Sequence, residues 1–88
     1  MAKIVGIHTV RDFNTWKPLY DADEPRRSQA GMRTLKISTG KCEPNRVYMY
    51  WEVNDMNTFE KMLHDPELKK KMQEAGVTSP LDYCVMEA

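Results

Sequence analysis

The chain has little cysteine or histidine, no long apolar run and no net charge, and each of these scarcities excludes a class of protein. Its two cysteines, Cys42 and Cys84, do not form a Cys-x-x-Cys pair, which indicates reduced thiols in a cytoplasmic protein rather than a disulfide framework. Its two histidines, His8 and His64, are far apart and belong to no cysteine cluster, so no zinc or iron site is recognisable. We therefore expect neither a metal nor another cofactor.

Membranes and nucleic acids are also not expected as partners. Apolar residues never run for the ~20 positions that a bilayer-spanning helix needs. Residues 1–7 pass directly into a strand-like segment without a small-residue cleavage site, so they do not form a secretory signal. Thirteen Lys and Arg balance thirteen Asp and Glu, whereas a protein that binds a phosphate backbone usually carries an excess of basic residues.

Length and composition predict one small globular domain that covers residues 1–88. Hydrophobic residues make up 41% and charged residues 30% of the 88 residues, which is ordinary for a folded protein. A domain of this size buries only about 60–65% of the surface of its unfolded chain, so its own stability is marginal. A partner subunit would add buried surface.

Apolar periodicity predicts the order strand, helix, strand, strand, helix pair, strand. The strands are predicted at residues 3–10, 32–39, 46–53 and 82–87, and the helical segments at 12–30, 54–64 and 66–76. Asp12 is the expected N-cap of the first helix, which Pro18 and Pro25 should bend and Gly31 should end. Short connections and right-handed crossovers fold this order into an α+β, ferredoxin-like βαββαβ domain: a four-stranded antiparallel sheet with helices on one face.

Alternation along the strands assigns side chains to the two faces of the sheet. In strand 46–53 one face carries Val47, Met49, Trp51 and Val53, and the other carries Tyr48, Tyr50 and Glu52. In strand 32–39 we expect Leu35 and Ile37 on one face and Thr34, Lys36 and Ser38 on the other. Because the helices cover only one face, a monomer would leave an aromatic, half-polar face open. Such a patch usually marks a partner surface, so we expect a homodimer closed into a dimeric α/β barrel.

Four segments carry a resemblance to a known superfamily. They are the run from Asp12 to Asp21 after a His-bearing first strand, Ala30-Gly31-Met32, Asn45 through Trp51-Glu52-Val53, and Asp65-Pro66-Glu67-Leu68-Lys69 followed by Ala75-Gly76-Val77. Together they resemble small cyclase-like and antibiotic-biosynthesis-monooxygenase-like members of the dimeric α/β-barrel superfamily. The resemblance spans nearly the whole chain and implies the fold and the dimer.

The chemistry that this resemblance implies is diverse. The superfamily includes monooxygenases, polyketide cyclases, haem-degrading enzymes, isomerases and proteins with no known activity. Its oxygenase and haem-degrading members are known for Asn, Trp and His or Arg side chains in the cleft, and no motif of this chain matches that trio. The first-strand position that resembles a catalytic Asn of some members holds His8.

His8, Tyr50 and Glu52 are the residues that we predict to be catalytic. If Val5 and Ile7 face the helices, His8 lies on the opposite face, beside the third strand at the centre of the sheet. Imidazole has a pKa near 6.5 and exchanges protons at neutral pH. A carboxylate would orient it, and a Tyr hydroxyl would hold a carbonyl or phenolic oxygen.

Tyr48, Lys36 and Arg27 are the predicted ligand-binding residues. The tyrosine ring suits a flat, partly apolar ligand, and Arg27 at the rim of the cleft would hold an anionic group. The leading hypothesis is thus a cytoplasmic homodimer that binds a small aromatic or polyketide-like molecule between sheet and helices. The hypothesis includes cofactor-independent cyclase or monooxygenase chemistry, although the sequence leaves open whether the protein is an enzyme.

Each of these assignments has a structural alternative. His8 could be a hydrogen-bonded polar core residue, Tyr48 and Tyr50 dimer packing, Glu52 an ion-pair partner of Lys36, and Arg27 part of a solvated helix face. Trp16 and Trp51 fall on helix-facing positions, so we predict that both belong to the core. The alternative function is a non-catalytic ligand-binding or stress-type barrel protein, whose inner face is filled by side chains and whose cavity would be below about 300 Å³. An RNA-binding module would also place aromatic residues on its third strand, but the Lys/Arg-Gly-aromatic start of that motif is missing.

Overall fold

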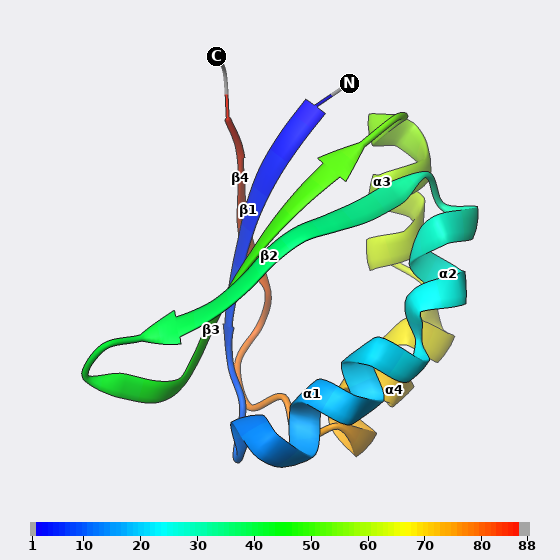
Figure 1. Ribbon diagram of the computed structural model, residues 1–88. Coiled ribbons are helices and arrows are strands. Elements are labelled where there is room, and N and C mark those ends of the chain that lie inside the picture. Colours follow the sequence, from blue (N-terminus) through cyan, green and yellow to red (C-terminus); the bar gives the residue numbers. More distant parts are fainter. Residues whose placement is uncertain (1, 87–88) are drawn as a thin grey trace.

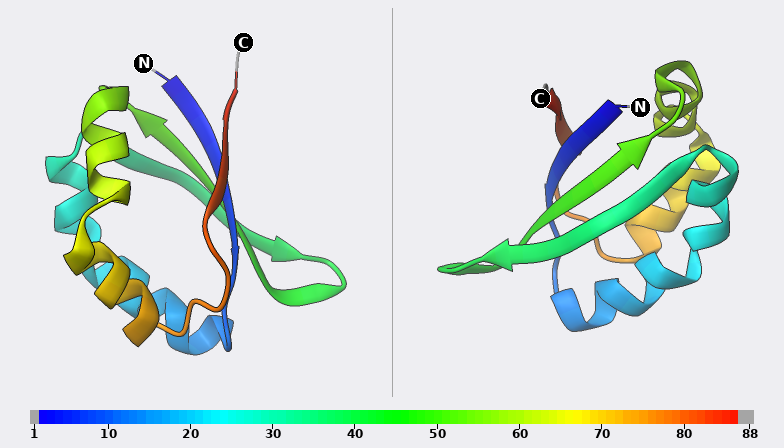
Figure 2. Two further views of the ribbon diagram at one scale, coloured as in Figure 1. Left: turned by 180° about the vertical axis from the view of Figure 1, so that it is seen from behind. Right: turned by 45° about the horizontal axis from the view of Figure 1, so that its top comes forward.

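A four-stranded antiparallel sheet forms one layer of the protein, and the helices form the other. The computed structural model describes residues 2–86, and Figures 1 and 2 show all of its helices on one face of a strongly twisted sheet. The strands are β1 (Ala2–Thr9), β2 (Met32–Gly40), β3 (Glu43–Val53) and β4 (Asp82–Met86), in the spatial order β2-β3-β1-β4. The predicted α+β, ferredoxin-like fold is therefore confirmed. Glu87, the predicted end of the last strand, lies outside the described residues.

Each helix is preceded by an aspartate at its N-cap, and the N-cap predicted at Asp12 is confirmed. The helices are α1 (Phe13–Ala22), α2 (Glu24–Gln29), α3 (Met56–Leu63) and α4 (Pro66–Glu74). Asp12, Asp55 and Asp65 each accept a hydrogen bond from the backbone N–H two residues ahead, which satisfies a donor that the first helical turn leaves free. Within the described chain, no helix has the length and apolar character required to cross a membrane.

The predicted bend in the first helical segment is a complete break at Asp23. Pro18 lies inside α1 without ending it, and Pro25 occupies the first turn of α2, where its missing N–H removes no helical hydrogen bond. Gly31 follows with a φ of +75°, the left-handed conformation expected at the end of a helix. The break leaves Asp23 between two helices, where it reaches the cavity described below.

The core lies between the sheet and the helices. Ile4, Val47 and Phe59 are fully buried, and Trp16 and Trp51 are 2% and 4% exposed, so the prediction that both tryptophans belong to the core is confirmed. The burial pattern of β3 follows the predicted alternation, with its apolar face toward the helices.

Strand β2 departs from the predicted alternation. The pairing with β3 shifts between Thr34 and Lys36, so Leu35 is left out of the register and is 44% exposed. Thr34 and Ile37 pair with Trp51 and Met49, the helix-facing residues of β3. The prediction that Leu35 and Ile37 share a face opposite Thr34 was wrong, because one extra residue in a bulge reverses the alternation.

Gly6 allows a close approach in the middle of the sheet. The indole ring of Trp51 lies over this residue, and a Cβ atom at position 6 would stand 2.5 Å from the nearest ring carbon. Only glycine leaves room for this ring position, which is why a residue with weak strand propensity occurs inside β1.

We predict that Gly6→Ala lowers the free energy of unfolding by about 1–3 kcal/mol, because the added methyl group forces Trp51 out of its place. Urea denaturation followed by tryptophan fluorescence measures this change. Lys3→Ala, at an exposed position of the same strand, is the control and should alter stability by less than about 0.5 kcal/mol. Equal stability of Gly6→Ala and the wild type would contradict the proposed packing.

Candidate functional site

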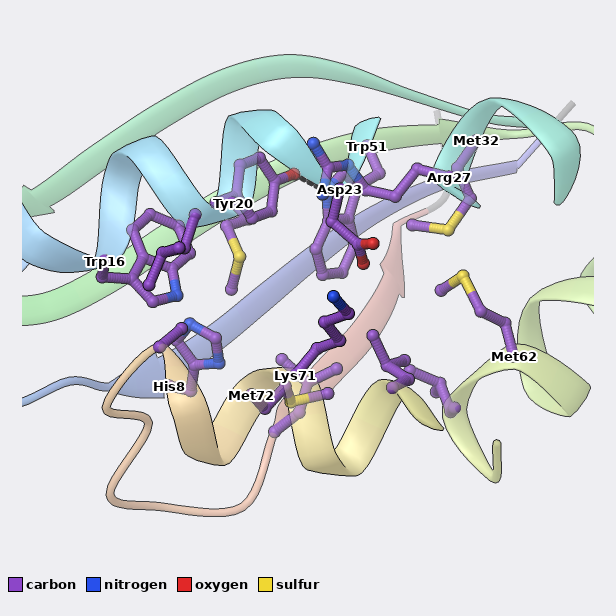
Figure 3. A pocket seen from close by; sticks show the side chains of 16 residues that line it. His8, Trp16, Tyr20, Asp23, Arg27, Met32, Trp51, Met62, Lys71 and Met72 are labelled. Carbon is purple, nitrogen blue, oxygen red and sulfur yellow. Dashed lines mark hydrogen bonds between the residues drawn. The ribbon is translucent and has the colours of Figure 1, made fainter. Parts of the chain in front are cut away.

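A cavity lies between the helix-facing side of the sheet and the helices (Figure 3). The cavity has a volume of about 80 Å³ and opens to solvent at its mouth. Met32, Met49, Met62 and Met72 contribute to a lining that is mostly apolar. Methionine side chains adapt their shape readily, so these walls can adjust to an apolar guest.

His8 is a buried polar group of this cavity. Its side chain extends from β1 toward α1, and its ring meets that of Trp16 edge to face at a centroid distance of 5.4 Å. The residue is 6% exposed, and neither ring nitrogen has a hydrogen-bond partner among the described residues. Burial lowers the pKa of His8 from 6.5 to about 4, so its imidazole is uncharged at neutral pH.

The sequence-based prediction placed His8 on the wrong face of the sheet. Ile4 and His8 are buried beneath the helices, whereas Val5 and Ile7 belong to the outer face and are only half-buried. In the register, His8 lies opposite Val47, which is also helix-facing. Apolar side chains thus occupy both faces of β1, and their hydrophobicity alone could not identify the face toward the helices.

The remaining predicted catalytic residues lie on the outer face, away from His8. Glu52 accepts a hydrogen bond from Arg33 Nη2 at 3.1 Å, so the ion pair expected with Lys36 forms with Arg33 instead. Tyr50 lies opposite Lys36 in the β2–β3 register. The structure therefore does not bring His8, Tyr50 and Glu52 together.

Tyr48 and Lys36, two of the predicted ligand-binding residues, also do not line the cavity. The Tyr48 hydroxyl accepts a hydrogen bond from Arg46 Nε at 3.1 Å on the outer face. Lys36 is exposed on the same face. Of the residues predicted from the sequence to form the site, His8 and Arg27 are the two that line the cavity.

Arg27 extends from α2 into the cavity wall. It is 7% exposed, so the alternative of a solvated helix face is wrong. Its guanidinium carbon lies 3.6 Å from the centroid of the Tyr20 ring, a close cation–π arrangement. Its Nε has no hydrogen-bond partner among the described residues.

An aromatic network connects α1 to the sheet. Trp51 Nε1 donates a hydrogen bond to the Tyr20 hydroxyl at 2.8 Å, and that hydroxyl lies 2.7 Å from Thr34 Oγ1. The ring of Tyr20 stacks on that of Trp16 at a centroid distance of 4.7 Å. The sequence indicated only a core role for these rings, although the four-residue spacing of Trp16 and Tyr20 already placed both on one face of a helix.

Ion pairs join the helices at the edge of the cavity. Arg26 contacts Asp23 at 3.2 Å, Asp65 at 3.2 Å and Glu67 at 2.9 Å. Because Asp65 and Glu67 belong to the start of α4, these contacts tie α2 to α4 over the cavity. In the part of the chain that the structure describes, no three His, Cys, Asp or Glu side chains gather into a group that could hold a metal ion.

Comparison with solved structures identifies the fold. SnoaB, a cofactor-independent oxygenase from Streptomyces nogalater, superposes with a TM-score of 0.71 at 14% identity over 99% of this chain and 91% of that one. An antibiotic biosynthesis monooxygenase gives a TM-score of 0.66 at 14% identity over 100% and 98% of the two chains. An uncharacterized NIPSNAP domain protein from Burkholderia xenovorans superposes with a TM-score of 0.68 at 11% identity, over 100% of this chain and 94% of that one.

The chain has the antibiotic-biosynthesis-monooxygenase-like fold. The resemblance inferred from the sequence is therefore confirmed as a likeness of fold, which is all that identities of 11–14% establish. No protein-family model and no curated protein matches this sequence.

We predict that His8 makes folding stability depend on pH between about 6.5 and 4. Because the folded-state pKa lies below the unfolded one, the unfolded chain takes up the proton first as the pH falls. Stability is therefore complete above about pH 6.5 and decreases toward pH 4, by at most about 3 kcal/mol.

Urea denaturation of the wild type and His8→Asn at pH 7.5 and pH 4.5 tests this dependence. The difference between the two proteins isolates His8 from the carboxylates that also take up protons in acid. The wild type should lose more stability than the variant. Equal losses would show that the imidazole is as accessible to protons in the folded protein as in the unfolded chain.

Proposed function

We propose that this protein binds a small aromatic or polyketide-like molecule in the cavity between its sheet and its helices. The observation that carries the proposal is the presence of two buried polar side chains, His8 and Arg27, with nitrogens that lack protein partners in a mostly apolar cavity. Burial without hydrogen bonds is unfavourable for such groups, and a ligand or solvent in the cavity would supply the missing partners.

We further propose cofactor-independent chemistry with His8 as the base. An uncharged imidazole can accept a proton from a phenolic hydroxyl. The resulting phenolate can transfer an electron to dioxygen and form a C–O bond to it at a ring carbon, and the hydroperoxide so formed loses water to leave a quinone. A pKa of about 4 makes His8 a weak base, which suits an acidic hydroxyl group better than a C–H bond. The likeness in fold to SnoaB supports this direction without assigning the reaction.

A non-catalytic barrel protein is the second candidate. The cavity has a volume of about 80 Å³, which is below ~300 Å³, so its size favours this candidate over a roomy ligand pocket. A guest with several rings would have to extend into the open mouth or displace the methionines. Binding without turnover would favour this candidate.

The proposed homodimer would form through the outer face of the sheet. Val5, Ile7, Tyr48 and Tyr50 are half-buried there, and the helices cover the opposite face. Tyr50, Glu52, Tyr48 and Lys36 would then act at the interface. Cys42 and Cys84 are exposed free thiols, which is consistent with the proposed cytoplasmic location.

We predict that His8→Ala lowers the dioxygen consumption of the protein with the single-ring phenol hydroquinone by about 100-fold or more, as expected for loss of a general base. An oxygen electrode measures turnover, and quenching of tryptophan fluorescence measures binding of the same probe. His64→Ala, at an exposed position outside the cavity, is the control. Unchanged turnover in folded His8→Ala would exclude His8 as the base, and binding without any turnover by the wild type would select the non-catalytic candidate.

We predict that Tyr50→Arg shifts the protein from dimer to monomer, because a charge in the centre of the outer face would be buried without a partner at the interface. Sedimentation velocity measures the change. Gln73→Arg adds the same charge at an exposed position on α4 and should leave the dimer intact. A folded wild-type monomer at high concentration would rule out the proposed assembly.

A further inference from the structure

No carboxylate of the described residues forms an ion pair with the guanidinium group of Arg27. Guanidinium groups stay charged in proteins, and a buried charge usually has a carboxylate or several acceptors near it. Among the described residues, no hydrogen bond or ion pair involves the side chain of Arg27, although the residue is only 7% exposed. Tyr20 covers one face of the guanidinium, and its donors lie along the edge of that plane. The edge is therefore the part that a ligand could meet.

Two of the side chains that line the cavity, Arg27 and Lys71, are cationic and one, Asp23, is acidic, whereas Arg26 at its edge is paired with Asp65 and Glu67 as well as with Asp23. The carboxylate of Asp23 accepts from Arg26 Nε at 3.2 and 3.3 Å. Lys71 extends from α4 with its ammonium group toward Asp23 across the cavity (Figure 3). One carboxylate that is already bonded to Arg26 thus faces two further cations, Arg27 and Lys71. An anion that lies beside Arg27 and Lys71 would be attracted by both groups.

We infer that the ligand of this cavity carries an anionic oxygen group, a carboxylate or a phenolate, which Arg27 binds and Lys71 attracts at the mouth. This inference rests on the proposed binding function and adds the charge of the ligand to it. The planar guanidinium, supported by Tyr20, matches the geometry of a carboxylate. The apolar part of the ligand would contact the methionines, with the uncharged His8 as a further polar contact inside the cavity.

The size of the cavity favours a compact anion. About 80 Å³ for the centres of water-sized molecules, extended by the open mouth, fits a single aromatic ring with one acidic substituent better than a system of fused rings. Benzoate and benzamide are therefore suitable probes, because they share shape and size and differ in charge.

Titration calorimetry of the wild-type protein with both probes tests the inference. Benzoate should bind at least about tenfold more tightly than benzamide, because a charge-assisted bidentate contact is stronger than a neutral one. Equal affinity for the two probes would overturn the anion inference while leaving the proposed binding function in place. Failure of both probes to bind would count against both.

Variants assign the preference to named residues. Arg27→Met should reduce the ratio of the two affinities to about one, and Lys71→Met should reduce it in part. Lys70→Met, next to Lys71 on α4 but outside the cavity lining, is the matched control and should keep the full ratio. A full ratio in folded Arg27→Met would overturn the assignment to Arg27.

A spectroscopic measurement keeps the inference testable if Arg27→Met does not fold. The Nε–H resonance of Arg27 in the ¹⁵N-labelled wild type should shift on addition of benzoate and not on addition of benzamide. If benzoate does not change the chemical shift of this resonance while calorimetry detects its binding, the anion is bound elsewhere.

Discussion

Two polar side chains buried without protein partners are the constraint on which this account depends. His8 and Arg27 are 6% and 7% exposed, and each has at least one nitrogen that no described residue satisfies. A buried polar group without a hydrogen bond lowers the free energy of unfolding by about 1–3 kcal/mol, which is a large fraction of the total for a small domain. Groups of this kind are therefore more readily explained by binding than by stability.

The aromatic network explains how the cavity persists in so small a protein. Gly6 gives Trp51 its position over β1, Trp51 hydrogen-bonds to Tyr20, and Tyr20 stacks on Trp16. The same Tyr20 ring supports Arg27. Large rigid rings thus span the space between the layers, so that flexible methionines can line the rest of it. The ion pairs of Arg26 hold α2 and the start of α4 together at the edge of the cavity.

The strand and helix order was predictable because its signals are local. Asp12, Asp55 and Asp65 cap helices in the usual way, and β3 alternates strictly. The bulge at Leu35 was not predictable, because nothing in the residues of β2 marks where an extra residue leaves the register.

The candidate site was predicted only in part, for a related reason. Strand β1 carries apolar residues at both its odd and its even positions. Its sequence therefore does not reveal which face the helices cover. His8 was therefore predicted on the outer face, where Tyr50 and Glu52 lie, although its side chain is on the helix-facing side. Arg27 was predicted at the rim of the cleft and lines the cavity, but its burial depends on the break at Asp23 and on the Tyr20 ring, which no sequence pattern specifies.

A high-resolution crystal structure of the purified protein tests the central claim most directly. The account predicts electron density for a ligand or ordered solvent in the cavity, within hydrogen-bonding distance of a His8 ring nitrogen and of Arg27 Nε. A cavity filled by the protein's own side chains, with both residues hydrogen-bonded to neighbouring protein groups, would contradict it.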